Sequence, residues 1–213
     1  MITYLSAMIG RHIANKADNQ EQAEVIAYGI EIILGAIIKG LIISLVTWFI
    51  GTFYETWLVL FFSALLRIFS GGVHCTSYTR CLITSSFVFS SLGLVVKLWQ
   101  PHLTEQSIFA IITLSTLVLL VICVIWIPAG NEVRPLEKYN DRVRFKTLSF
   151  GIISLYFLVF IVVLNYFSII PKTFLLASIT GFLWQGFTVT PFGYSLVGTF
   201  DSFLISLSLT KGR

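Results

Sequence analysis

The sequence is poor in charge: only 11% of its 213 residues are Asp, Glu, Lys or Arg, against about a quarter in a typical soluble domain. Apolar residues make up 56% of the chain, and the mean hydropathy is +0.90. A soluble domain of this length could not bury so much apolar surface in one core. The scarcity of charge therefore excludes an ordinary water-soluble protein and predicts a lipid bilayer as the solvent.

The sequence also lacks the alternation of apolar and polar residues that is typical of membrane β-strands, because its apolar runs are continuous. In lipid every backbone polar group must be paired within the chain, so continuous runs predict helices. The predicted fold class is all-α: a polytopic integral membrane helical bundle of about six transmembrane segments. The last segment is expected to kink at Thr188–Pro191. The segments are residues 30–50, 57–70, 82–99, 108–127, 148–170 and 173–196.

The N-terminal region lacks the pattern of a secretory signal peptide, because charge follows the first apolar residues instead of preceding them. Apolar residues recur at helical spacing from Ile2 to Ile13. We therefore predict an amphipathic helix over residues 1–27 that lies at the membrane surface. The chain shows no linker, second domain or internal repeat, which predicts a single membrane-embedded domain over residues 1–213.

Basic residues are scarce on one side of the predicted topology. With six spans and the N-terminus inside, eleven of the fourteen Lys and Arg residues fall on the inner side. Lys97 and Lys172 fall outside, and Lys39 lies within the first span. Cytoplasmic loops favour basic residues, so we expect both termini and the basic loop at 128–147 in the cytoplasm. The net charge of +4 follows from this bias and from attraction to anionic lipid, so no nucleic-acid partner is expected.

The segment 66–81, called the catalytic segment below, is unusual for a membrane bundle. It contains two arginines, a glycine pair, one histidine and two of the three cysteines. Ionisable groups at membrane depth are costly and mark functional sites. The pair Gly71-Gly72 breaks a helix directly after the short span 57–70. We therefore predict a re-entrant-like break, which is tolerated only where it is buried in protein or lines a wet cavity.

A cysteine with a histidine in reach is the minimal apparatus of a thiol nucleophile. His74 and Cys81 lie on one face of a continuous helix, but about 10.5 Å apart along its axis, which is too far for a hydrogen bond. A Cys-His dyad therefore requires a break in the helix between them or a contact across a subunit interface. Cys75 adjoins His74 and points elsewhere on a regular helix, and spacing alone does not choose between the two cysteines.

Other interpretations of the catalytic segment stay open. A buried cysteine is most often a small apolar packing residue. His74, Cys75 and Cys81 lack the spacing of a metal site, so neither a metal nor another cofactor is expected, and a disulfide is not expected in a reducing cytosol. The alternative function is a small membrane transporter or channel with the glycine pair in its substrate path. A third possibility is a non-catalytic assembly or sensing protein.

Arg67, the Gly71-Gly72 pair, His74 and Cys81 together resemble the accessory gene regulator B (AgrB) family of bacterial membrane endopeptidases. In that family an arginine, a histidine and a cysteine stand at successive seven-residue steps, with the glycine pair just before the histidine. Arg67, His74 and Cys81 reproduce both intervals. A proline-bracketed loop after the fourth span also looks like the family's, and the resemblance extends over essentially the whole chain.

The resemblance implies a cysteine endopeptidase that cuts the C-terminal part from a small AgrD-like quorum-sensing propeptide. Cys81 would attack the scissile carbonyl to form a thioester acyl-enzyme, with His74 as general base and acid. A cysteine or serine of the bound propeptide would then attack the thioester and close a thiolactone or lactone ring. The resemblance also implies a homodimer in the bacterial cell membrane, with its active site near the cytoplasmic face.

Arg67 has several possible roles. It could stabilise the oxyanion, bind a propeptide carboxylate or favour the thiolate of Cys81, or it could be a snorkelling residue at a helix end. Gly71 and Gly72 are expected to support the substrate or the oxyanion. No residue is assured as a third member that orients His74, and a dyad can suffice. The candidates for such a member are Ser70, Thr76, Ser77 and Gln185.

Overall fold

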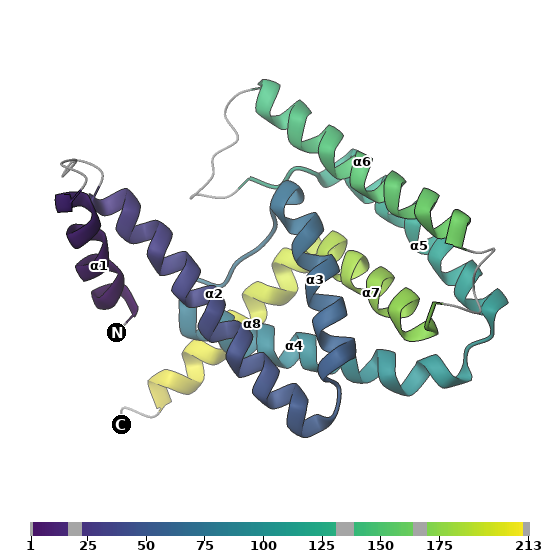
Figure 1. The fold of residues 1–213 in the computed structure, drawn as a ribbon, viewed down its shortest axis with the longest axis horizontal. Helices are drawn as coiled ribbons and strands as arrows, with labels where there is room; N and C mark the ends of the chain where they lie inside the picture. The colour runs from purple at the N-terminus through teal and green to yellow at the C-terminus, as the bar shows by residue number, and fades with distance from the viewer. Residues whose placement is uncertain (1, 17–22, 131–138, 164–169, 211–213) are drawn as a thin grey trace. The chain divides into compact units, whose positions relative to one another are not determined.

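The computed structural model describes residues 2–16, 23–130, 139–163 and 170–210. Over these ranges the chain is helical almost throughout (Figure 1), and its only β-structure there is an isolated bridge between Gly71 and Ala129. The predicted all-α fold class is confirmed. The elements are α1 (Ile2–Lys16), α2 (Ala23–Ile50), α3 (Phe53–Ser70), α4 (Tyr78–Trp99), the short 3-10 helix η2 (Gln100–His102), α5 (Glu105–Trp126), α6 (Tyr139–Val163), α7 (Lys172–Thr188) and α8 (Pro191–Thr210).

The chain forms two compact units, and the first, residues 1–46, contains α1 and most of α2. Within it the two helices pack through small residues. A Cβ atom at Gly10 would lie 2.7 Å from the Cβ of Ala27, so glycine permits this close helix approach. Apolar side chains on another face of α1, such as Leu5, remain exposed. An apolar face of this kind is what the predicted amphipathic helix requires.

The N-terminal helix is shorter than the predicted range of 1–27. α1 ends at Lys16, and Ala23 already belongs to α2. Residues 17–22 lie outside the described residues. That the whole chain acts as one domain stays a prediction.

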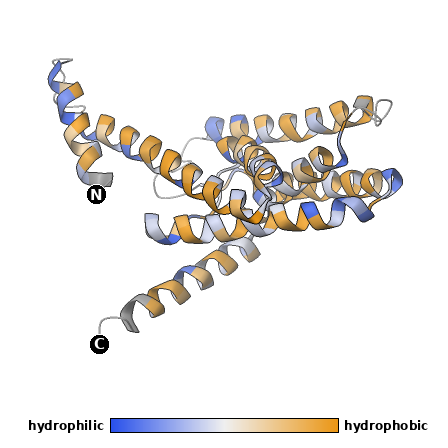
Figure 2. Ribbon diagram, turned by 60° about the horizontal axis from the view of Figure 1, so that its bottom comes forward, coloured by the Kyte–Doolittle hydropathy of each residue, from blue (hydrophilic) through white to orange (hydrophobic). Residues whose placement is uncertain are grey.

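Within the described ranges, five helices are long and apolar enough to cross a bilayer: α2, α3, α4 with η2, α5 and α6. The chain is accordingly a multi-pass membrane protein, and Figure 2 shows apolar residues along the length of its helices. α7 corresponds to the sixth predicted segment. It has 17 residues and extends about 25 Å, slightly less than the hydrocarbon thickness of about 30 Å.

The sixth predicted segment, residues 173–196, is not one kinked helix, so its predicted extent is wrong. α7 ends at Thr188 and α8 begins at Pro191. The Thr190 hydroxyl accepts a hydrogen bond from the N–H of Gly193 at 3.2 Å, and proline is favoured at the first helical position. The local sequence therefore starts a second helix where the hydropathy pattern indicated a bend.

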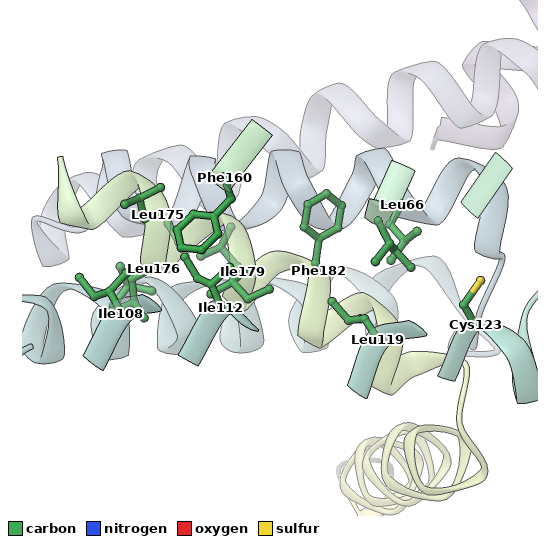
Figure 3. Close-up of a cluster of buried hydrophobic side chains, with 14 of the residues drawn as sticks. Leu66, Ile108, Ile112, Leu119, Cys123, Phe160, Leu175, Leu176, Ile179 and Phe182 are labelled. Atoms are coloured by element: carbon green, nitrogen blue, oxygen red, sulfur yellow. The ribbon is translucent and has the colours of Figure 1, made fainter. Parts of the chain in front are cut away.

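α7 is the central helix of the second unit, residues 47–213. It packs against α3, α4, α5 and α8, and most of its residues are buried. A Cβ atom at Gly181 would lie 2.4 Å from the carbonyl oxygen of Val59, so Gly181 allows α7 to lie very close to α3. The core (Figure 3) includes Leu66, Ile108, Ile112, Leu119, Cys123, Phe160, Leu175, Leu176, Ile179 and Phe182.

The basic region after α5 differs from the predicted loop over 128–147. α6 begins at Tyr139, because the lysines and arginines that follow are good helix formers. Residues 131–138, which include part of the predicted basic charge, lie outside the described residues. Lys146 Nζ donates to the carbonyl of Val124 at 2.5 Å, where the last turn of α5 leaves carbonyl groups without helical partners.

Candidate active site

The catalytic segment is interrupted as predicted. α3 ends at Ser70, α4 begins at Tyr78, and the residues between them are not helical. Gly71 adopts φ +72° and ψ −146°, a conformation that only glycine reaches readily. A Cβ atom at this position would lie 2.1 Å from the carbonyl oxygen of Ala129. Gly71 therefore both ends α3 and allows the chain that leaves α5 to come close.

Two backbone hydrogen bonds hold the glycine pair in place. The N–H of Ala129 donates to the carbonyl of Ser70 at 2.8 Å, and the N–H of Val73 donates to the carbonyl of Thr188 at 3.2 Å. At Gly72 (φ +131°) a Cβ atom would lie 2.9 Å from Thr188 Oγ1. The missing side chain at Gly72 lets the segment pass directly over the C-terminal end of α7.

The Arg67 guanidinium joins α3, α7 and the segment that carries His74. Its Nη1 donates to Gln185 Oε1 at 3.2 Å, and its Nη2 donates to the carbonyl of Val73 at 2.7 Å. Nη2 also lies 3.4 Å from Nδ1 and 3.2 Å from Nε2 of His74. These nearly equal distances mean that Nη2 is aimed at neither nitrogen lone pair. The contacts favour a role for Arg67 within the site over that of a snorkelling side chain.

Gln185 is the buried centre of this network, with no exposed surface. Its Nε2 donates to Ser70 Oγ at 2.9 Å and to the carbonyl of Gly71 at 2.7 Å, while its Oε1 accepts from Arg67. Of the four candidates for a third residue, Gln185 and Ser70 belong to this network. Gln185 fixes Arg67 and the glycine pair in position, so any action on His74 runs through Arg67.

Cys81 lies in the first turn of α4. Its N–H donates to the carbonyl of Ser77 at 2.9 Å, and its half-buried sulfur lies 3.9 Å from Ser85 Oγ. His74 is exposed and precedes the helix in the non-helical segment. The helix is thus interrupted between His74 and Cys81, as a dyad within one chain requires.

Cys75, the other cysteine of the segment, has a different environment. Its thiol donates to Thr84 Oγ1 at 3.8 Å. Burial raises the pKa of the Cys75 thiol, with smaller effects from Thr84 and Cys81. A thiol with a raised pKa is protonated at neutral pH and is a poor nucleophile. In the described part of the chain no three His, Cys, Asp or Glu side chains gather where they could hold a metal ion.

We expect iodoacetamide at pH 7.5 to alkylate Cys81 faster than Cys75. Because burial raises the pKa of Cys75, its alkylation should increase only as the pH rises above the ordinary thiol value of about 8.5. Peptide mapping by mass spectrometry, on protein in lipid nanodiscs between pH 7 and 10, measures both rates in one sample. Faster labelling of Cys75 at neutral pH would contradict this assignment.

Asp201 was not among the residues singled out from the sequence. It lies on α8, is 5% exposed, and forms an ion pair with Arg80 at 2.6 Å. It also accepts a hydrogen bond from the hydroxyl of Thr76 at 2.6 Å. The signal that could have found it is a single carboxylate in an otherwise uncharged helix, since such charges are costly in a membrane protein and mark function.

Comparison with known proteins identifies the same family that the motif resembles. The model of the family described as accessory gene regulator B matches residues 3–189. This range includes the whole catalytic segment and Gln185, and it ends before Asp201. No solved structure matches the chain.

Three curated proteins are similar to the chain. A putative AgrB-like protein of Clostridium perfringens (strain SM101 / Type A) is 26% identical over 212 residues, which cover 95% of this chain and 98% of that protein. Putative AgrB-like protein 2 of Clostridium perfringens (strain 13 / Type A) is 24% identical over 217 residues, which cover 95% and 98%. A putative AgrB-like protein of Clostridium beijerinckii is 34% identical over 162 residues, which cover 74% and 75%.

Proposed function

The chain belongs to the accessory gene regulator B family, and from this premise we propose that it is a membrane cysteine endopeptidase acting on an AgrD-like propeptide. The family takes part in processing the AgrD propeptide in quorum sensing. The observation that carries the finer proposal is the helix break between Ser70 and Tyr78. It places His74 in a non-helical segment directly before the helix start that carries Cys81.

In the proposed reaction the Cys81 sulfur attacks the scissile carbonyl of the propeptide. His74 takes the thiol proton as general base and returns it to the leaving amine, so the carbon–nitrogen bond breaks as the thioester forms. The position of Cys81 in the first turn of α4 supports this role, because the positive end of the helix dipole stabilises an anionic sulfur.

The second step closes the ring. A cysteine thiol or serine hydroxyl within the bound propeptide attacks the thioester, which releases a thiolactone or lactone and regenerates the Cys81 thiol. A thioester is reactive enough for this transfer, and a site at the membrane edge that limits water suppresses the competing hydrolysis.

Arg67 and the glycine pair serve the same site. Arg67 brings a positive charge that can stabilise the oxyanion or the thiolate, and its bonds to Gln185 and Val73 hold that charge beside His74. Gly71 and Gly72 supply the backbone path that these bonds require. A propeptide carboxylate is a further possible ligand of the guanidinium.

The proposal includes a setting in the cell. The protein would be a homodimer in the bacterial cell membrane, with both termini and the active site on the cytoplasmic side, where the propeptide is synthesised. The excess of Lys and Arg on the inner side of the predicted topology supports this orientation. The helix break supports a dyad formed within one protomer.

The test is mass spectrometry on protein in lipid vesicles, incubated with the small propeptide encoded beside its gene. We expect release of a C-terminal fragment together with an acyl adduct on the peptide that contains Cys81. Cys75→Ala is the matched control, and it should retain both signals because its thiol is kept protonated by burial. If folded protein binds the propeptide without cleavage or acylation, the peptidase proposal fails, and transport assays in the same vesicles follow.

A further inference from the structure

Asp201 of α8 holds the two ends of the stretch between His74 and Cys81. Its carboxylate accepts the N–H of Thr76 at 3.2 Å, the Thr76 hydroxyl at 2.6 Å and Arg80 Nε at 2.6 Å. Arg80 Nη2 also donates to Thr76 Oγ1, so the three side chains close a small network. Hydrogen bonds to a charged acceptor are about twice as strong as neutral ones.

Both partners of Asp201 adjoin the proposed dyad. Thr76 lies two residues after His74 in the non-helical segment, and Arg80 directly precedes Cys81 in the first turn of α4. The opposite end of the non-helical segment is fixed by Arg67 and Gln185. A single carboxylate of α8 thus bonds to the far end of the stretch that carries the proposed dyad.

The packing of α8 does not explain why residue 201 is charged. Over residues 191–207 of α8, the buried residues are Gly193, Val197 and Asp201 at four-residue spacing. Phe200 packs on Phe87 of α4 with ring centroids 6.2 Å apart. Replacing a buried ion pair with apolar residues is often neutral or stabilising for a fold. Packing alone would therefore be served by apolar residues at both positions 80 and 201, so the ion pair between Arg80 and Asp201 suggests a further role.

We propose that Asp201 is a positioning residue of the peptidase, which fixes the non-helical segment and the first turn of α4 so that the Cys81 thiol faces the scissile carbonyl. The inference rests on the proposed function but goes beyond it, since Asp201 lies outside the residues that the family model matches. The Thr76 hydroxyl and Arg80 hold the pKa of Asp201 below its usual value, so the carboxylate is charged at neutral pH.

The experiment compares wild type with Asp201→Ala and Asp201→Asn, with Ser202→Ala as the matched control because Ser202 is the next, exposed residue of α8. We expect Asp201→Ala to lower kcat for propeptide cleavage by about tenfold to a hundredfold, with KM within about twofold. Asp201→Asn should be intermediate, because its amide oxygen still accepts from Thr76. Ser202→Ala should match wild type.

A second readout does not depend on the propeptide. The rate at which iodoacetamide alkylates Cys81 should change at least about fivefold in Asp201→Ala. The midpoint of thermal unfolding in detergent should fall only slightly, because Thr76 is exposed and Arg80 is only partly buried, so water can replace the carboxylate. Thr76→Val should cost less in the Asp201→Ala background than in wild type, because both changes remove the bond between the Thr76 hydroxyl and Asp201.

The outcomes separate the two proposals. Wild-type protein that does not cleave contradicts the peptidase, whereas unchanged kcat and unchanged Cys81 alkylation in Asp201→Ala contradict the positioning role alone. A loss of kcat that only follows a loss of folded protein also overturns it. Should Asp201→Ala fail to fold, Asp201→Asn and Thr76→Val give the same comparison on milder changes.

Discussion

Alanine in place of Cys81 should abolish propeptide cleavage, with kcat lowered by at least about a thousandfold, and leave propeptide affinity within about twofold. In the proposed reaction the Cys81 sulfur forms the thioester bond of the acyl-enzyme, and an alanine methyl group cannot replace it. Its approach to Ser85 Oγ, at 3.9 Å, is too weak for its loss to disturb the fold. Cleavage is measured by chromatography of the released C-terminal fragment, and affinity by pull-down of labelled propeptide on nanodiscs.

The other two cysteines are the matched controls for this result. Cys75→Ala and Cys123→Ala should cleave at nearly the wild-type rate, since Cys75 is kept protonated by burial and Cys123 is part of the apolar core. Cleavage that survives in Cys81→Ala and disappears in Cys75→Ala would transfer the nucleophile to Cys75. Cleavage that survives in both would end the cysteine mechanism.

The catalytic segment could be predicted from the sequence because its signals are local. The intervals from Arg67 to His74 and on to Cys81 are read directly from the chain. The break after Ser70 follows from a glycine pair, and Gly71 indeed takes a φ of +72°. Properties of this kind need no knowledge of distant partners, so a single sequence is enough to find them.

The residues of distant helices that bond to the catalytic segment could not be predicted from the sequence. Gln185 was one of four candidates for a third residue, and nothing in the pattern distinguished it, because its bonds to Arg67 and Gly71 span more than a hundred residues. Asp201 was missed altogether. The hydropathy pattern ran α7 and the start of α8 together, and the N-terminal cap at Thr190 that separates them was interpreted as a kink.

These two distant residues act at opposite ends of one segment. Gln185 holds the end that contains Arg67 and the glycine pair, and Asp201 holds the end next to Cys81. α7 and α8 thereby provide the rigid support that a break in a membrane helix lacks by itself, since its backbone groups lose their helical partners. In the proposed mechanism, the spacing of Arg67, His74 and Cys81 identifies the reacting groups, and residues of the C-terminal helices hold the segment that carries them.

Gln185→Leu should lower kcat by about a hundredfold and reduce the free energy of unfolding by about 3 kcal/mol. Leucine has a similar volume, so the fully buried site stays filled. The substitution removes the acceptor of Arg67 Nη1 and the amide donor to Ser70 Oγ and to the carbonyl of Gly71. The Ser70 hydroxyl still donates to the carbonyl of Gly71 at 3.2 Å. Buried polar groups that lose their partners are costly, and more so where one is charged.

Two further variants make this test more specific, one elsewhere on α7 and one at position 185 itself. Thr180→Val is the matched control on α7, because the Thr180 hydroxyl donates to the carbonyl of Leu176 within the same helix. Activity and unfolding of this variant should stay near wild type. Gln185→Glu keeps an acceptor for Arg67 but places an oxygen against the carbonyl of Gly71, so it should recover only part of the loss. Unfolding is followed by thermal denaturation in detergent and kcat by fragment release. A Gln185→Leu protein with wild-type kcat would show that the Arg67 network does not orient the site, because the guanidinium would then act equally well without its buried acceptor.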